Sequence, residues 1–125
     1  MILDTNAVSA LFANDPALVG TLSGAATHHL PVIVIGEYLF GLRGSDQLAK
    51  LGPKLVELEA SSSVLPVTLT TAEVYGKVRD ELRRKGHPIP DNDIWIAALA
   101  REHGLDIVSR DSHFDAVDGV QRLSW

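Results

Sequence analysis

Residues Pro31–Ile35 have the sequence PVIVI, a wholly apolar run in which every residue after the proline is β-branched. Such a run is typical of a strand buried on both faces, as in a parallel sheet. On either side of it, short apolar runs alternate with longer stretches whose apolar residues recur at helical spacing. Strands separated by helices predict right-handed βαβ units. We therefore expect an α/β fold, a three-layer α/β/α sandwich with a mainly parallel central sheet.

The remaining predicted elements follow from the same patterns. The other predicted strands are Ile2-Leu3, Val64–Val67, Leu105–Ser109 and a short one within Val120–Trp125. The predicted helices are Ala7–Phe12, Pro16–Thr27, Glu37–Leu42, Asp46–Ala60 with a kink or break at Pro53, a helix opened by a capping box at Thr70–Glu73 and running to Gly86, and one capped by Asp91 or Asn92 and ending at Gly104. No linker separates regions of different composition, so we expect residues 1–125 to form one domain.

Composition excludes several classes of function. Eleven Lys and Arg against sixteen Asp and Glu give a formal charge of −5, which argues against a protein held to nucleic acid or membrane by an overall positive field. The chain has no cysteine, so disulfides, thiolate zinc sites and cysteine nucleophiles are excluded. No apolar run approaches the roughly 20 residues of a membrane span, and no basic segment precedes the first apolar residues. We expect a soluble, cytoplasmic protein.

Four acidic residues occupy positions where this fold class places its sites. Asp4 directly follows the first predicted strand, and Glu37 and Asp111 each lie two residues after the end of a later one. Asp93 lies in the first turn of the last predicted helix. Ligands of parallel sheets bind beyond the carboxyl ends of the strands. We therefore expect these four side chains to converge.

Converging carboxylates repel one another unless a cation neutralises them. Oxygen-only ligation suits Mg²⁺ or Mn²⁺ better than zinc, and such an ion can polarise a phosphoryl oxygen. The alternative is that each acid caps a helix or turn. For Asp91 this alternative is at least as good as a metal role, and Asp111 could cap a turn through Ser112 and His113. The five histidines show no recognisable metal spacing, and we expect none to be a ligand.

Four blocks of the sequence resemble the motifs of PIN-domain ribonucleases, and within that family the VapC-type toxins of type II toxin–antitoxin pairs. The blocks are Met1–Asn6, Gly36–Gly41, Pro88–Ala98 and Ser109–Phe114, in the family's order and spanning nearly the whole chain. The resemblance implies a Mg²⁺- or Mn²⁺-dependent endoribonuclease in which water attacks the phosphodiester and leaves 5′-phosphate and 3′-hydroxyl ends. It also implies neutralisation by a cognate antitoxin, and a homodimer or a toxin–antitoxin hetero-oligomer.

By position, the family's acidic quartet falls on Asp4, Glu37, Asp93 and Asp111, which the resemblance makes the catalytic and metal-binding residues. Asn6 matches a polar position that holds the site by hydrogen bonding, and Asp91 is accessory. Ser109 stands where the family often has threonine, and both supply a hydroxyl.

Basic residues near the expected site are candidates for RNA binding. These are Arg43, Arg83, Arg84, Lys85 and Arg110. Phosphate contacts could run along the helix that ends at Gly86 toward Asp93, although such a run is more often a solvated helix face. Two other functions stay open: a PIN nuclease of RNA processing or DNA metabolism with no toxic role, and a non-catalytic, receiver-like module that binds a regulatory cation.

Overall fold

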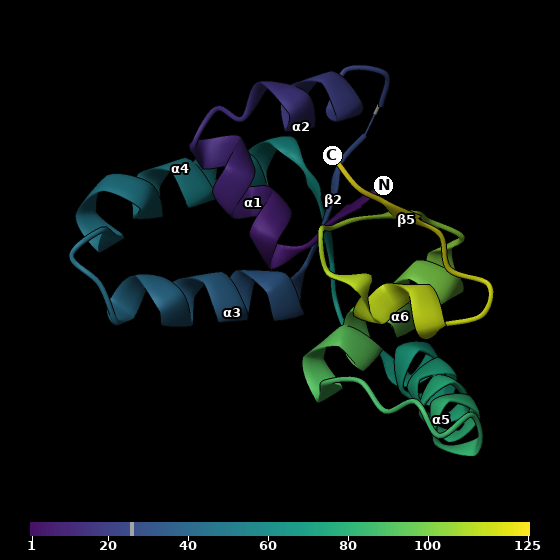
Figure 1. The fold of residues 1–125 in the computed structure, drawn as a ribbon. Coiled ribbons are helices and arrows are strands. Elements are labelled where there is room, and N and C mark those ends of the chain that lie inside the picture. Colours follow the sequence, from purple (N-terminus) through teal and green to yellow (C-terminus); the bar gives the residue numbers. More distant parts are fainter. Residues whose placement is uncertain (26) are drawn as a thin grey trace.

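The computed structural model describes residues 1–25 and 27–125, in which short strands alternate with helices (Figure 1). The strands are β1 (Ile2–Leu3), β2 (His29–Pro31), β3 (Ser63–Leu65), β4 (Ile107–Val108) and β5 (Arg122–Leu123). The helices are α1 (Thr5–Phe12), α2 (Pro16–Leu22), α3 (Val32–Arg43), α4 (Leu48–Ser61), α5 (Leu69–Arg84) and α6 (Asp91–His103), with a 3₁₀ helix, η1, at Ser112–Ala116.

The five strands form one sheet in the order β3-β2-β1-β4-β5, and every neighbouring pair is parallel. Ile2 of β1 lies opposite His29 on one side and Ile107 on the other. Figure 1 shows α1, α3 and α4 on one side of the strands and α5 and α6 on the other. The predicted α/β/α sandwich is thereby confirmed. The strand order reverses direction between β1 and β4, and in open α/β sheets such a switch point is where ligands bind.

The predicted strand at Pro31–Ile35 is wrong. The strand begins two residues earlier, at His29, and the predicted strand residues after Pro31 are helical. Strand β2 ends at Pro31, and α3 begins at Val32. The β-branched run is helical because Val34, Tyr38 and Leu42, spaced four residues apart, bury one helix face in the core. Burial of this face outweighs the β-propensity of the individual residues.

Two predicted helix starts are also misplaced. Helix α5 begins earlier, with Thr68 as N-cap and Thr71 completing the capping box, so the box expected at Thr70–Glu73 does not form. The buried Thr71 hydroxyl also donates to Glu102 of α6 at 2.7 Å, which fixes this register. Helix α6 has Pro90 as its N-cap residue, so Asp91 is the first helical residue and not a cap.

Most other boundaries shift by a few residues. Helix α4 continues through Pro53, and α2 ends at Leu22; the predicted extension to Thr27 includes Ala26, which lies outside the described residues. Gly86 and Gly104 follow α5 and α6 with φ of +65° and +63°, as predicted for glycines that end helices.

The core lies on both faces of the sheet. Leu3, Leu30 and Val108 from the strands and Leu99 from α6 are fully buried, and each such side chain stabilises the fold by about 1.5–3 kcal/mol. Because the central strands are covered on both faces, polar groups can approach β1 and β4 only at their ends. None of the helices in the described part of the chain has the length and hydropathy that crossing a membrane requires.

Candidate active site

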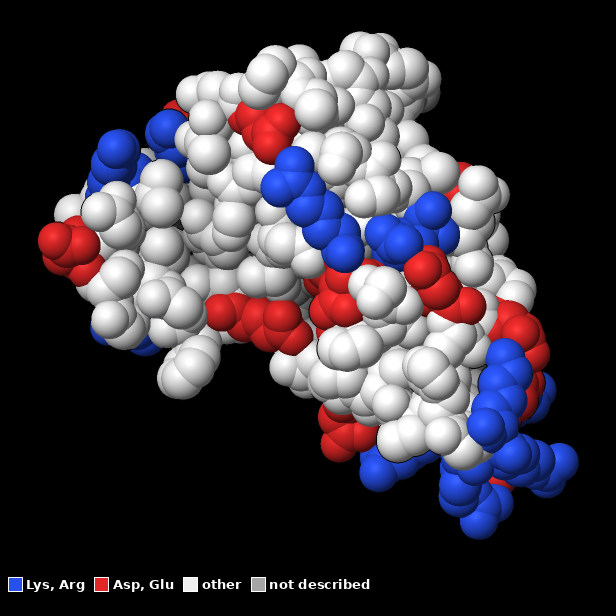
Figure 2. All heavy atoms as spheres, viewed as in Figure 1, with Lys and Arg blue, Asp and Glu red and all other residues white. Residues whose placement is uncertain are grey.

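The predicted acidic residues gather at the carboxyl edge of the sheet, at the switch point between β1 and β4. Asp4 follows β1 and Asp111 lies just beyond β4. Glu37 comes from the second turn of α3 and Asp93 from the first turn of α6. Figure 2 shows acidic side chains at the centre of this face, with basic side chains beside them and a separate basic group near α5. The topology therefore places the four acids on one face.

Asp4 is a buried carboxylate that caps nothing. Its side chain makes no capping hydrogen bond to α1, and the residue is only 5% exposed. The Ser109 hydroxyl donates to Asp4 Oδ2 at 2.7 Å, and Asn6 Nδ2 donates to the same oxygen at 3.1 Å. Burial raises the pKa of Asp4 despite the Ser109 bond, and the charges of Glu37 and Asp111 raise it further. The capping interpretation therefore does not account for Asp4.

Asn6 and Ser109 join the ends of β1 and β4 around that carboxylate. Asn6 Nδ2 also donates to Ser109 Oγ at 3.0 Å, and Asn6 Oδ1 accepts the backbone N–H of Arg110 at 3.1 Å. Ser109 Oγ accepts the N–H of Asp111 at 2.9 Å. Both residues lie where the sequence predicted accessory positions, and their hydrogen bonds hold Asp4 and the Asp111 backbone in one network.

Glu37 is held in the site by Thr5, a residue that the sequence patterns did not single out. The hydroxyl of Thr5 donates to Glu37 Oε2 at 2.8 Å. Thr5 is adjacent to Asp4, which is the one signal that could have singled it out. Glu37 reaches the site from α3 and not from the end of a strand, so the route assumed for it was wrong although its neighbourhood was right.

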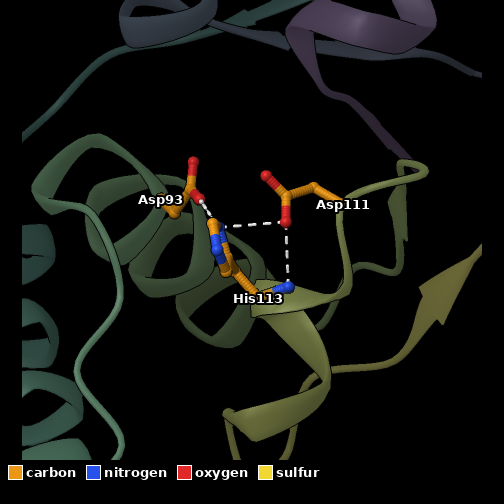
Figure 3. A group of neighbouring side chains, drawn as sticks. All are labelled: Asp93, Asp111 and His113. Atoms are coloured by element: carbon orange, nitrogen blue, oxygen red, sulfur yellow. Dashed lines mark hydrogen bonds and ion pairs between the residues drawn. The ribbon is translucent and has the colours of Figure 1, made fainter.

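Asp93 and Asp111 meet at a histidine (Figure 3). Nδ1 of His113 lies 3.0 Å from Asp93 Oδ2 and 2.9 Å from Asp111 Oδ1. The backbone N–H of His113 also donates to Asp111 Oδ1 at 2.9 Å, so Asp111 caps η1, as the alternative interpretation proposed, and faces the site as well. In the sequence, His113 was placed only in the turn that Asp111 could cap, and no histidine ligand was expected; the structure instead groups His113 with Asp93 and Asp111 as potential ligands, and its position two residues after Asp111 was the available signal.

The electrostatics of this group follow from its crowding. Burial raises the pKa of Asp93, as do the charges of Asp4 and Asp111, and the bond from His113 only partly opposes the rise. The hydrogen bond to Asp93 raises the pKa of His113, and the charge of Asp111 adds to the effect. Ionised carboxylates are thus costly here, and positive charge is favoured.

The other predicted residues lie outside this cluster. Asp91 is exposed and accepts hydrogen bonds from Tyr75 Oη at 2.9 Å and from Arg79 at 2.8 Å, so its contacts are with α5. The basic candidates, with one exception, form ion pairs on the surface. Arg83 and Arg84 pair with Asp80, Lys85 with Asp118 and Arg110 with Asp15. The exception is Arg43, which has no ion pair within the part of the chain that the structure describes; as the last residue of α3 it lies roughly 9 Å along the helix axis from Glu37.

The donor set fits a divalent cation. Within residues 1–25 and 27–125, Asp93, Asp111 and His113 each offer a ligand atom, and these atoms all lie within 4.8 Å of one another. Asp4 adds a carboxylate whose Oδ2 takes both side-chain donors, which leaves Oδ1 as a potential ligand. Burial is the main cause that raises the pKa of Asp4 and Asp93, and repulsion between the carboxylates adds to it; a cation at this place would offset both effects.

Comparison with known proteins identifies the family. The PIN domain family matches residues 1–120, and the chain belongs to this family. It is 30% identical to ribonuclease VapC5 of Mycobacterium tuberculosis over 91 residues, covering 71% of this chain and 67% of the relative. It is 29% identical to the tRNA(fMet)-specific endonuclease VapC of Shigella flexneri, covering 99% of this chain and 96% of the relative.

Among solved structures, the chain resembles VapBC-5 of Mycobacterium tuberculosis, a member of the VapBC family of toxin–antitoxin systems. The two share 26% identity with a TM-score of 0.74, and the match covers 99% of this chain and 97% of that one.

Proposed function

We propose that this chain is a metal-dependent endoribonuclease that acts as the toxin of a toxin–antitoxin pair, with residues 1–125 forming one nuclease domain. The observation that carries the proposal is the convergence of Asp4, Glu37, Asp93 and Asp111 at the switch point of a PIN-family sheet. The relatives, which are named as a ribonuclease and a tRNA-specific endonuclease, support the reaction class.

The four acids would hold Mg²⁺ or Mn²⁺ between them. When bound, the cation supplies Lewis-acid polarisation of a phosphoryl oxygen and activation of the attacking water. Ser109 and Asn6 fix the carboxylate of Asp4 through Oδ2, and Thr5 fixes Glu37. Water forms the new bond to phosphorus as the bond to the 3′ oxygen breaks, which leaves 5′-phosphate and 3′-hydroxyl ends. The 2′-hydroxyl takes no part in this reaction.

The partner of the chain, on this proposal, is a cognate antitoxin. The resemblance to a toxin–antitoxin complex supports it, and so does the surface beside Glu37. A groove of about 340 Å³ is lined by Val32, Ile33, Gly36, Glu37, Phe40 and Asn92. The Phe40 residue is 81% exposed, and a partner segment could cover this apolar surface while reaching the acidic site. We place the reaction in the cytoplasm, where RNA and antitoxin are both available.

The test is cleavage of RNA by the purified chain. With Mn²⁺ or Mg²⁺ the parent should cleave, EDTA should stop cleavage, and added metal should restore it. Asp4→Asn should abolish cleavage while leaving the circular dichroism spectrum unchanged, because it removes a ligand charge and keeps the side-chain shape. Cleavage by Asp4→Asn at the parental rate, or full activity in EDTA, would refute the proposal, and binding of metal without any cleavage would favour the regulatory module.

A further inference from the structure

The imidazole of His113 lies where two partly buried carboxylates of the site, those of Asp93 and Asp111, converge. Its Nδ1 atom lies within 3.0 Å of both Asp93 and Asp111, and the ring points toward both carboxylates (Figure 3). The side chain of Asp93 is 14% exposed and that of Asp111 is 34% exposed, so the meeting point of the three groups is reachable from solvent. A small cation can therefore enter between them.

The spacing of the three atoms suits a shared coordination shell as well as hydrogen bonds. In an octahedral shell with bonds of about 2.1 Å, adjacent ligand atoms lie roughly 3.0 Å apart. The two distances from His113 Nδ1 to the carboxylate oxygens, 3.0 and 2.9 Å, match that edge. An ion bound between the ring and the two carboxylates could therefore keep both of these distances nearly unchanged.

The backbone keeps the ring in this place. The N–H of His113 donates to Asp111 Oδ1 at 2.9 Å, which closes the first turn of η1. Phe114, the next residue, is fully buried and anchors the same turn. Because the backbone is held at His113 and at Phe114, the partly exposed imidazole stays directed toward Asp93 and Asp111.

We propose that Nδ1 of His113 is a direct ligand of the catalytic cation, and that this nitrogen makes the site prefer Mn²⁺ to Mg²⁺. The inference rests on the proposed function, which supplies the cation. Mg²⁺ is a hard ion that favours oxygen ligands and retains its waters, whereas first-row transition ions accept imidazole nitrogen readily. A site of carboxylates alone would discriminate less between the two ions.

Pulsed electron paramagnetic resonance on the full chain with Mn²⁺ tests the ligand directly. The echo modulation should show a nitrogen coupled to the bound Mn²⁺ in the parent, and His113→Asp should lose it while retaining the ion through an oxygen ligand. His87→Asn is the matched control, because His87 lines the same cavity of about 460 Å³ as His113 but lies outside the ligand cluster. This control should keep the nitrogen signal.

Calorimetric titration with Mn²⁺ and with Mg²⁺ tests the selectivity. The ratio of the two affinities should fall by about tenfold or more in His113→Asp, a change of the size that loss of a metal-site contact produces, and should stay parental in His87→Asn. A parent that binds Mn²⁺ without a nitrogen signal, or an unchanged ratio in His113→Asp, overturns this inference and leaves the nuclease standing. A parent whose Mn²⁺ binding is absent, or is unaffected by Asp93→Asn, overturns the proposed metal-dependent function itself.

Discussion

The acidic edge of the sheet and the basic end of α5 differ in how their charges are balanced. Among the described residues, Asp4 and Glu37 have no ion pair, and the only basic partner of Asp93 and Asp111 is the imidazole of His113, which is charged only when protonated. Around α5, in contrast, exposed cations lie beside acids: Arg84 is 3.0 Å from Asp80 and Lys85 is 2.7 Å from Asp118.

The difference separates a site from a solvated surface. Buried carboxylates without cationic partners cost stability, so they persist where a ligand supplies the missing charge. Exposed pairs cost little and contribute little. The strongly charged α5 end is thus the weaker functional candidate, although its charges are more conspicuous in the sequence.

The largest expected effect compares two acids of one helix. Asp93→Asn should lower the rate of RNA cleavage by about a hundredfold or more, because it removes a ligand charge from the cation site. Asp91→Asn, two residues away and bonded to α5, should retain activity near the parental level. Single-turnover cleavage with both variants measures the contrast, and equal losses in the two would show that the helix start as a whole, and not the cluster, matters.

Removal of the metal should lower the free energy of unfolding of the chain, and this loss should depend on the acids of the site. At a concentration one hundred times its dissociation constant, Mn²⁺ should raise the free energy of unfolding by about 2.7 kcal/mol through preferential binding to the folded state. Urea denaturation with Mn²⁺ and with EDTA measures this difference. Asp93→Asn should lose most of it, whereas Arg84→Ala should keep it; a parental response in Asp93→Asn would place the ion elsewhere.

Ser109→Ala should lower stability by about 1–3 kcal/mol, because the buried hydroxyl donates to Asp4 and accepts from Asn6 and Asp111. Ser109→Thr restores a hydroxyl and is the matched control. Thermal unfolding followed by circular dichroism distinguishes them. If the alanine variant melted with the parent, the hydroxyl network would not be what holds the two strand ends together.

The pH dependence of the metal-free chain has a fixed sign. Burial raises the pKa of both Asp4 and Asp93 above the ordinary range of an aspartate, so the folded state binds protons more tightly than the unfolded state. The loss of stability that the buried Asp4 and Asp93 cause is absent below a pH of about 4. It grows as the pH rises through the pKa values of the folded state, because the folded state then has to ionise these carboxyls. In EDTA, Asp4→Asn should weaken this loss of stability with rising pH. A steeper loss in the variant would contradict the assignment.

The smallest effect belongs to the basic end of α5. Replacing Arg83 and Arg84 by alanine should change the free energy of unfolding by less than about 0.5 kcal/mol each, since both are exposed and share Asp80. RNA affinity measured at two salt concentrations tests their other predicted role. A flatter salt dependence in the double variant would support phosphate contacts there, and an unchanged slope would leave α5 as a solvated face.

Much of the fold could be predicted because its cues are local. Apolar runs separated by helical periodicity indicate a parallel α/β sheet, and glycines such as Gly86 and Gly104 mark helix ends. The start of α3 could not be read in this way, because Val32–Ile35 suits a strand by propensity and becomes helical only when Val34 packs against the core. The capping box likewise begins at Thr68 and not at Thr70. The hydroxyl of Thr71, which completes this box, also donates to Glu102 on a different helix, and this contact is not encoded locally.

The sequence by itself determined the positions of the acids along the chain, their order and the class of sheet that carries them, because apolar runs and helical spacing are patterns of neighbouring residues. Only the tertiary structure decided that the hydroxyl of Ser109 would donate to Asp4, which lies about a hundred residues away along the chain. It alone also placed His113 between Asp93 and Asp111. The contact of His113 with Asp93 depends on the packing of α6 and η1 against the sheet, which brings together residues that lie twenty positions apart in the chain.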